Sequence, residues 1–302
     1  ALQWSERTKD SNSLANNHWD LAFFFKTHAV EDSAYYNFSK AQKIYAALKN
    51  DYNSGRMLYS MALVQGDIKD YTGSEISTIR AIELLKPLNK YEQLYQCYNN
   101  LGILSNALEE YDQALAYHNE ALGYLKKVNE KNDWEHTTEN NIGVVYENQG
   151  QHKMAISQFK KVLGHKEIKD TSPGLYAKAL DNLAYNRFKL KDTVQVEKQF
   201  TTALRIRDSV KDLAGLAVSH FNLAEYYLYK SDTLAAFGQA QEAKSLSIES
   251  SNNKRLLQTL ELLPRIDPKN AVVYTQEYMA LNDSLQQEER QIRNKFERIR
   301  FE

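Results

Sequence analysis

The sequence predicts an all-α solenoid of stacked helix pairs that ends in one long helix. Glycine and proline together make up 15 of 302 residues, about 5%, against roughly 12% in average proteins. An all-β sandwich or barrel needs a turn signal every 8–12 residues or so, and this chain cannot supply them. Small residues also recur every 40 or 41 residues, at Ala22, Ala62, Gly102, Gly143, Ala184 and Ala224.

Each repeat is predicted to be two amphipathic helices. In one unit, Leu101, Leu104 and Leu108 step by three and four residues after Asn100, as expected for one face of a helix. Ala114 and Ala121 follow in the second helix of that unit, and comparable small or aromatic residues occupy the same places in the other units. Short polar breaks separate the two helices of a unit, as at Glu109-Glu110, Lys191-Asp192 and Ser231-Asp232. Longer polar loops separate the units, for example from Asp170 to Gly174.

This pattern resembles the tetratricopeptide repeat family, with its small residue at position 8, Ala at 20, aromatic residue at 24 and Ala at 27. The usual period is 34 residues, so the period of 40–41 here is similar to the subgroup that includes bacterial peptide-sensing regulators. The resemblance implies a right-handed superhelix of helix pairs whose first helices line a concave face. A family with this architecture commonly binds peptides or proteins in that groove.

The chain divides into four expected parts. Residues 1–14 form an N-terminal extension, 15–250 six helix pairs, 251–269 a seventh partial repeat, and 270–302 a long connector helix. That last helix carries a heptad-like seam with steps of four and three residues: Leu281, Leu285, Glu288, Ile292, Lys295 and Ile299. The seam is compatible with a solubilising end helix or with a connector to a further module. It also makes a parallel homodimer through residues 281–299 plausible.

The segment 289–302 resembles the stretch that follows the repeats in bacterial membrane-bound regulators. In these, an extracytoplasmic repeat array precedes a coiled segment, a membrane helix and a histidine kinase or helix-turn-helix output domain. The resemblance implies a periplasmic sensory segment of an inner-membrane signal-transduction protein, with the membrane anchor and any kinase outside this chain. A soluble cytoplasmic scaffold or peptide-responsive regulator is the alternative. The 38 basic and 39 acidic residues show no excess of positive charge for nucleic-acid binding.

Asparagines recur at one position of the first helices, and they are the main candidates for ligand contact. Asparagine offers two donors and an acceptor, which suits the backbone of an extended peptide. Two interpretations stay open, because the same side chains could instead bond within or between neighbouring repeats. The candidate peptide-binding residues are Asn99, Asn100, Asn140, Asn141, Asn182, Asn222, Lys178, Asp181 and Tyr185.

The sequence contains no nucleotide-binding loop, zinc-protease motif or nucleophile elbow, so we expect no catalysis, no metal and no cofactor. Its seven histidines are scattered without metal-ligand spacing. His118 replaces an aromatic residue of the repeat, which predicts a packing role. Cys97 lies within a first helix between two tyrosines, which predicts a buried, inert thiol.

Overall fold

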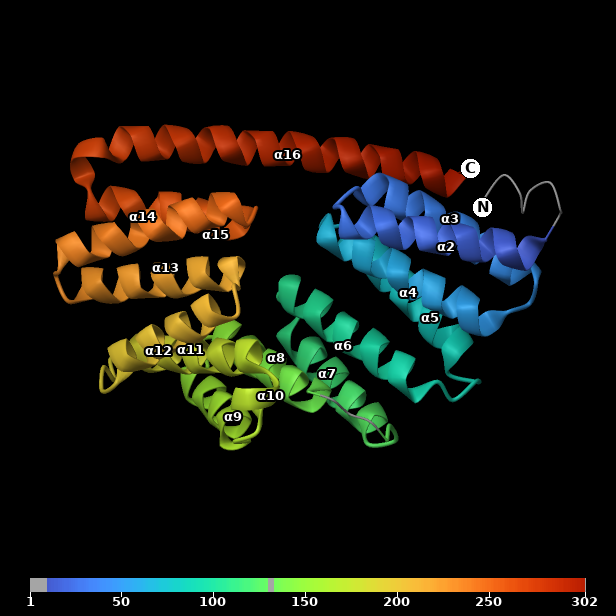
Figure 1. The fold of residues 1–302 in the computed structure, drawn as a ribbon, viewed down its shortest axis with the longest axis horizontal. Coiled ribbons are helices and arrows are strands. Elements are labelled where there is room, and N and C mark those ends of the chain that lie inside the picture. The colour runs from blue at the N-terminus through green and yellow to red at the C-terminus, as the bar shows by residue number, and fades with distance from the viewer. Residues whose placement is uncertain (1–9, 130–132, 302) are drawn as a thin grey trace. The chain divides into compact units, whose positions relative to one another are not determined.

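The computed structural model describes residues 10–129 and 133–301 and is all-helical over that part of the chain (Figure 1). The prediction of an all-α fold with a long final helix is therefore confirmed. The helices are α2 (Ser11–Thr27), α3 (Glu31–Ala47), α4 (Asp51–Asp67), α5 (Tyr71–Leu85), α6 (Tyr91–Ala107), α7 (Tyr111–Leu125), α8 (Trp134–Asn148), α9 (His152–Gly164), α10 (Ile168–Thr171), α11 (Pro173–Lys189), α12 (Val196–Ser209), α13 (Leu213–Tyr229), α14 (Thr233–Glu249), α15 (Asn253–Ile266), the 3₁₀ helix η1 (Pro268–Asn270) and α16 (Ala271–Phe301).

One connection differs from the expected polar loop. The segment from Asp170 to Gly174 contains the end of the short helix α10 and the start of α11. Pro173 is the first residue of α11, where its missing N–H is not needed and its fixed φ favours the helix. The expected loop is therefore reduced to the single residue Ser172.

The recurring small residues lie where the two helices of a pair touch. Ala22, Ala62, Ala184 and Ala224 are fully buried. At Gly143, an added Cβ would come within 2.5 Å of the Phe159 ring on the partner helix. At Gly102, it would lie 2.6 Å from the His118 ring, so both glycines are required for close helix packing, as predicted.

The scarcity of glycine has a second explanation in the junctions between helices. Residues with φ near +60° follow most of the helices, and apart from Gly150 they are not glycine: Ala29, Lys49, Lys69, Asn89, Glu109, Lys191, Lys211, Ser231 and Ser251. Such left-handed residues satisfy the last carbonyls of a helix. At several junctions the next residue caps the following helix, as Asp232 accepts from the Ala235 N–H at 3.0 Å. A junction of three residues, as at 230–232, therefore ends one helix and starts the next.

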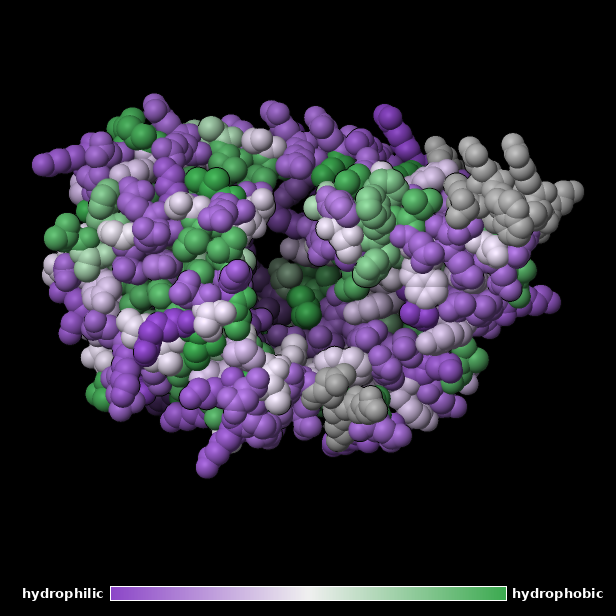
Figure 2. Space-filling model, in the orientation of Figure 1, coloured by the Kyte–Doolittle hydropathy of each residue, from purple (hydrophilic) through white to green (hydrophobic). Residues whose placement is uncertain are grey.

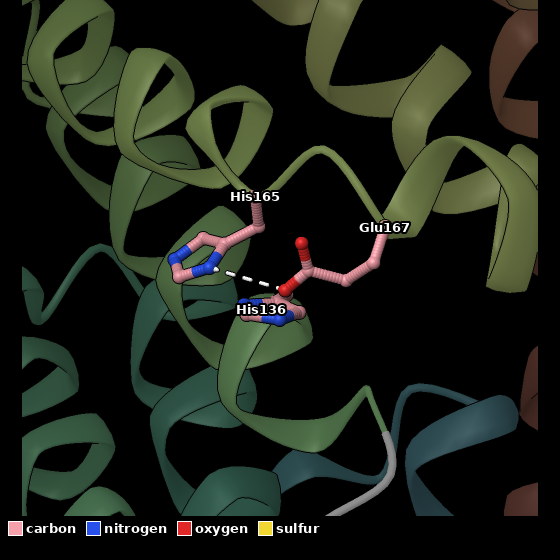
Figure 3. A group of neighbouring side chains, drawn as sticks. All are labelled: His136, His165 and Glu167. Carbon is pink, nitrogen blue, oxygen red and sulfur yellow. Dashed lines mark ion pairs between the residues drawn. The ribbon is translucent and has the colours of Figure 1, made fainter.

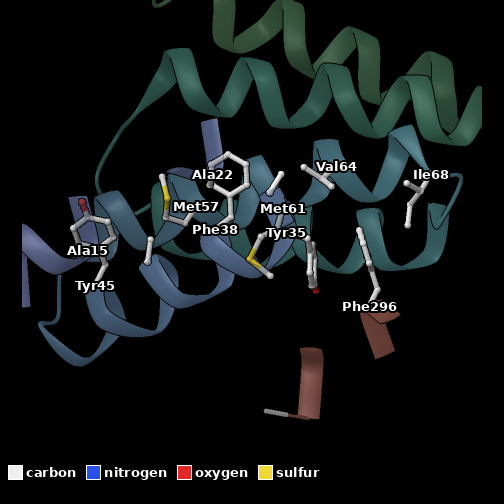
Figure 4. Packing of buried hydrophobic residues seen from close by; sticks show 12 residues of the cluster. Ala15, Ala22, Tyr35, Phe38, Tyr45, Met57, Met61, Val64, Ile68 and Phe296 are labelled. Carbon is white, nitrogen blue, oxygen red and sulfur yellow. The ribbon is translucent and has the colours of Figure 1, made fainter. Parts of the chain in front are cut away.

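The chain forms two compact units, which are described separately. Unit 1 comprises residues up to Thr138 together with Gln287 onwards. One of its hydrophobic clusters gathers Phe38, Tyr45 and Met57 from α3 and α4, and Phe296 near the end of α16 packs into the same cluster (Figure 4). A second cluster centres on α6, with Leu94 and Leu125 nearly inaccessible to solvent.

Unit 2 comprises Glu139–Gln286. Phe159 and Phe200 fill the space between the helices of their pairs, and Leu263 on α15 packs with the small residues of α14. On the face shown in Figure 2, hydrophilic and hydrophobic residues are interspersed. Among the described residues, none of the helices combines the length and the apolar character needed to cross a bilayer.

Helix α16 contributes to both units. Tyr274 and Leu281 pack with the cluster of α13–α15 in unit 2. Ile292 and Ile299, two residues of the predicted seam, pack against the cluster of α3 and α4 in unit 1. In this structure these two seam positions are thus used within a single chain, and the expected parallel dimer stays a prediction.

Candidate functional site

The two candidate asparagines of unit 1 bond to neighbouring helices. Asn100 is buried, and its amide donates to the Thr78 hydroxyl at 3.1 Å. The Asn99 carbonyl oxygen lies 3.1 Å from Nδ1 of His118 and accepts from the Thr138 hydroxyl at 3.4 Å. These contacts correspond to the structural interpretation of the asparagine series, since they join adjacent repeats.

The four candidate asparagines of unit 2 lie on α8, α11 and α13. Asn182 donates from its amide to the Asn140 oxygen at 3.3 Å, which links α11 to α8. Asn140 is fully buried and Asn222 is 6% exposed, whereas Asn141 and Asn182 are half-buried. Asn141 and Asn182 are therefore the members of the series in this unit that a ligand could reach without rearrangement.

Asp181 is the centre of a buried polar network below this face. Its carboxylate accepts from the Arg207 guanidinium at 2.8 Å and from the Ser219 hydroxyl at 3.0 Å. Burial raises the pKa of Asp181, and the charge of Arg207 opposes that effect. Arg207 also donates to the Gly215 carbonyl. Asp181 thus joins α11 to α12 and α13 and does not itself reach the surface.

A half-buried acid, Glu147, lies near the C-terminal end of α8. Burial raises the pKa of Glu147, partly offset by the hydrogen bond that it accepts from the Asn186 amide. Asn186 is fully buried and also donates to the Asn182 carbonyl at 2.8 Å. The Asn186 side-chain amide therefore links the Glu147 carboxylate on α8 to the backbone carbonyl of Asn182 on α11.

The remaining candidates, Lys178 and Tyr185, extend along α11. Lys178 is exposed, yet desolvation by the surrounding protein and repulsion from Arg207 lower the pKa of its ammonium group. Tyr185 is half-buried, with the Lys189 ammonium 4.7 Å from its ring centre. Lys189 also pairs with Glu225 at 3.5 Å. Although desolvation lowers the pKa of Lys189, the Glu225 carboxylate raises it overall, so this lysine stays charged.

A cleft of about 280 Å³ opens beside this ion pair, between α11, α13 and α15. Its apolar walls come from both aromatic and aliphatic side chains, and two cations and one carboxylate stand at its edge. Phe188 and Tyr229 meet edge to face there, with ring centres 5.3 Å apart. The cleft is lined by Phe188, Lys189, Glu225, Leu228, Tyr229, Leu262 and Arg265. Such a cleft can hold an apolar side chain whose neighbours carry opposite charges.

The sequence interpretation missed most of these lining residues. Lys189 and Tyr229 occupy equivalent positions in successive first helices, and each comes directly after another lining residue, Phe188 or Leu228. The sequence feature that could have predicted these lining residues is a large apolar residue followed by a residue with a polar group at the same position of successive first helices, as in Phe188-Lys189 and Leu228-Tyr229. Arg255 on α15 was also missed; its guanidinium stacks on the Phe221 ring at 4.4 Å.

At the connection between α9 and α10, His165 lies between two carboxylates. Nδ1 of His165 lies 3.6 Å from the Glu167 carboxylate (Figure 3), and Nε2 lies 3.9 Å from Glu139. Glu139 also pairs with Lys161. His136, His165 and Glu167 each offer one potential ligand atom, and these atoms lie within 4.8 Å of one another (Figure 3), so their spacing is compatible with a bound metal ion.

His118 and Cys97 lie in the interior of unit 1, as their packing roles predicted. His118 is 1% exposed, and burial lowers its pKa to about 4, so its imidazole is neutral at pH 7. Cys97 is fully buried, and burial raises the pKa of its thiol to about 12. A thiol in that state is neither nucleophilic nor accessible.

Comparison with known proteins supports the repeat assignment. The tetratricopeptide repeat profile matches residues 93–167. No curated protein matches the chain in sequence. Solved structures match its fold: aspartyl phosphate phosphatase F from Bacillus subtilis has a TM-score of 0.72 at 18% identity, over 93% of this chain and 74% of the other.

Two further structures share this fold. The Rap conjugation gene regulator of plasmid pLS20, in complex with the Phr* peptide, gives a TM-score of 0.71 at 13% identity, over 94% of this chain and 77% of the other. The apo form of RapI gives 0.71 at 16% identity, over 94% of this chain and 99% of the other. The helix pairs, their buried small residues and the matching profile together show that this chain has a tetratricopeptide-repeat fold.

Proposed function

We propose that this chain is a non-catalytic regulator that binds a peptide or an extended protein segment on the first helices of unit 2. The cleft beside Lys189 and Glu225 carries the proposal, because it combines apolar walls with paired and unpaired charges. Arg265 is exposed at its edge and can pair with an acidic ligand group. Asn141 and Asn182 are half-buried on neighbouring first helices, where they can bond to a peptide backbone.

A structure of the same fold that holds the Phr* peptide supports this class of ligand. The chemistry of the cleft narrows the ligand further. An aromatic or large aliphatic side chain would pack on Phe188 and Tyr229, an acidic neighbour would meet Arg265, and a basic neighbour would meet Glu225.

A calorimetric titration of the full chain with synthetic hexapeptides tests the proposal. The probe has a central Phe flanked by Glu on one side and Lys on the other, and the comparison peptide has Ser in place of Phe. We expect the Phe peptide to bind and its affinity to fall by about tenfold or more in Arg265→Ala and Tyr229→Ala. Lys126→Ala, an exposed change directly after the end of α7, is the matched control. Equal affinity in all variants, or no binding of any peptide of this design, would reject the cleft as the site.

The proposal that the chain is not an enzyme has its own test. One structure of the same fold is named an aspartyl phosphate phosphatase. We therefore choose acyl-phosphate hydrolysis as the reaction to measure, with a phosphorylated receiver domain as substrate. No acceleration of phosphate release is expected, because no catalytic motif is present in the sequence and Cys97 is buried with a raised pKa. Release that depends on a defined side chain would contradict the proposal.

We further propose that this segment serves a membrane-anchored signalling protein, with the repeats in the periplasm. The resemblance of residues 289–302 to the segment before the membrane helix in such regulators supports this, as does the length of α16. The soluble cytoplasmic regulator is the alternative. The complete reading frame distinguishes them, because the membrane-anchored form requires an upstream signal sequence and a downstream apolar span of about 20 residues.

A further inference from the structure

The C-terminal part of α16 carries apolar residues that can pack either against unit 1 or against another helix. Ile292 and Ile299 belong to the heptad-like seam, yet both pack within unit 1 against the cluster of α3 and α4. Phe296 lies between them in sequence and is 1% exposed. Its spacing from the two isoleucines is four and three residues, which is the pattern of a helix bound in a groove.

The docked state is held by a small number of side chains. The Phe296 ring stacks on Tyr35 with centres 4.4 Å apart (Figure 4). Two ion pairs of opposite polarity flank the stack: Lys295 contacts Asp32 at 3.0 Å, and Glu289 contacts Lys69. These pairs fix the direction in which the segment lies on unit 1.

A hollow open to solvent borders the docked segment. It has a volume of about 440 Å³ and is lined in part by Phe25, Tyr36, Lys295 and Ile299. Both ion pairs are at least partly exposed to solvent, so salt screens them and each contributes little. An interface bordered by an open hollow and held partly by exposed ion pairs can open without unfolding the unit beneath it.

Once released, the seam itself selects its partner and the direction of pairing. In a parallel dimer, equivalent residues face each other, so Glu288 would meet Glu288 and Lys295 would meet Lys295 of the second copy. Reversing one helix about Ile292 instead brings Leu285 opposite the second copy's Ile299, because each lies seven residues from Ile292. The same reversal brings Glu288, four residues before Ile292, opposite the second copy's Phe296, one residue from the second copy's Lys295.

We propose that residues 285–299 alternate between docking on unit 1 and antiparallel pairing with a second copy of this chain. The two states exclude each other, because both use the apolar side chains of Ile292 and Ile299, which are partly buried against unit 1 in the docked state. Opposite charges then lie close together at both polar positions of the seam, whereas parallel pairing would place like charges together. The segment is thus a two-state element that converts undocking into self-association.

Sedimentation equilibrium of the full chain tests this proposal. Phe296→Ala removes the stacked ring and leaves every seam residue in place, so we expect the dimer dissociation constant to fall by about tenfold or more. Asp32→Ala removes the ion pair with Lys295, together with two local hydrogen bonds that Asp32 accepts from Ser33, and should shift the constant in the same direction by a smaller factor. Arg290→Ala, an exposed change outside seam and groove, is the control that should leave it unchanged.

Charge exchange in the Phe296→Ala background tests the direction. Glu288→Lys should weaken the dimer by about tenfold, because lysines then lie close together in the antiparallel pair. The double change Glu288→Lys with Lys295→Glu should restore it. A parallel dimer would be indifferent to the exchange, which would overturn the antiparallel assignment. If neither Phe296→Ala nor Asp32→Ala promotes association while the circular dichroism spectrum stays native, the coupling of undocking to self-association is wrong.

Discussion

Units 1 and 2 share helix pairing and small buried residues, but they differ in whether their interiors contain charged side chains. The buried polar residues of unit 1 are neutral: hydroxyls, amides and the uncharged His118. Among the described residues, the buried charged groups are Glu139, Asp181 and Arg207, and all three belong to unit 2. The same repeat geometry therefore supports two kinds of interior, and the ionised interior lies beneath the proposed peptide site.

This difference bears on function, because buried ion networks fix the position of the surface residues above them. Asp181 and Arg207 join α11, α12 and α13, two of which line the cleft. Perturbed ionisable groups also gather at functional sites more often than elsewhere. Unit 1 shows no comparable network of buried charges among its described residues, and its interior consists of apolar and neutral polar side chains.

The largest expected effect comes from breaking the buried ion pair of unit 2. Arg207→Leu leaves the Asp181 carboxylate buried without its partner, which should destabilise unit 2 by about 3–5 kcal/mol. Urea unfolding monitored by hydrogen exchange of α11–α13 amides measures it. The double variant Asp181→Leu with Arg207→Leu should recover much of the loss, since no unpaired charge then remains. If the double variant is as unstable as the single one, packing of Arg207 explains the effect and the comparison of interiors fails.

The second prediction concerns the neutral interior of unit 1 and its response to acid. Burial lowers the pKa of His118 to about 4, so the unfolded chain takes up a proton near pH 6.5 while the folded one does not. Its contribution is fully present above pH 6.5 and is lost as the pH falls towards 4, by roughly 3 kcal/mol.

The difference between wild type and His118→Gln isolates this effect from the titration of carboxylates. Stability measured by urea unfolding between pH 7 and 4 should decline more steeply in the wild type than in the variant. Parallel pH profiles would show that His118 ionises in the folded state and that unit 1 does not exclude charge.

The third prediction tests the close helix contacts that the two units have in common. In Gly143→Ala, the added methyl would lie 2.5 Å from Phe159, and we expect a loss of about 1–3 kcal/mol after repacking. Gly123→Ala on α7 is the matched control, because nothing lies within 4 Å of the new Cβ. It should raise stability by about 0.5–1 kcal/mol through helix propensity. Thermal unfolding distinguishes the two, and equal shifts would contradict the role assigned to the small residues.

The smallest effect is expected at the helix junctions. Lys211 and Ser231 adopt φ of 56° and 62°, conformations that glycine reaches at no steric cost. Lys211→Gly and Ser231→Gly should each stabilise unit 2 by up to about 1 kcal/mol, because glycine removes the steric cost of the left-handed conformation. The greater conformational entropy of glycine in the unfolded chain offsets part of this gain. Additive increases in the unfolding midpoint would support this account, whereas a decrease would show that the side chains contribute contacts.

The repeat was readable from the sequence because its cause is local. Helical periodicity and a small residue at each close contact recur with the same spacing, and Gly102 and Gly143 meet ring atoms as that spacing predicts. The asparagine series was readable as a pattern, but its partners were not. Asn100 bonds to Thr78, 22 residues away, which periodicity does not predict, whereas Asn182 bonds to Asn140 about one repeat away, which is one of the two interpretations that the sequence left open.

The candidate site shows the same division. Tyr185 and Lys178 were predicted from their position in a first helix, but neither lines the cleft. Arg265 and Leu262 were not predicted, because they lie on α15, where the repeat loses its second helix and its spacing. Phe296 escaped notice for a related reason: it falls outside the seam, and only its contact with Tyr35 reveals that it is buried.

By itself, the sequence determined the all-α class, the period of the helix pairs and the residues that must be small, since each depends on neighbours a few residues apart or on one repeated contact. The tertiary structure alone decided which polar side chains are buried, that ionised groups gather in unit 2, and that residues 289–299 pack within unit 1. The physical reason is that burial is a property of surfaces brought together from distant parts of the chain. The same amphipathic helix can satisfy its apolar face against its own fold or against another copy.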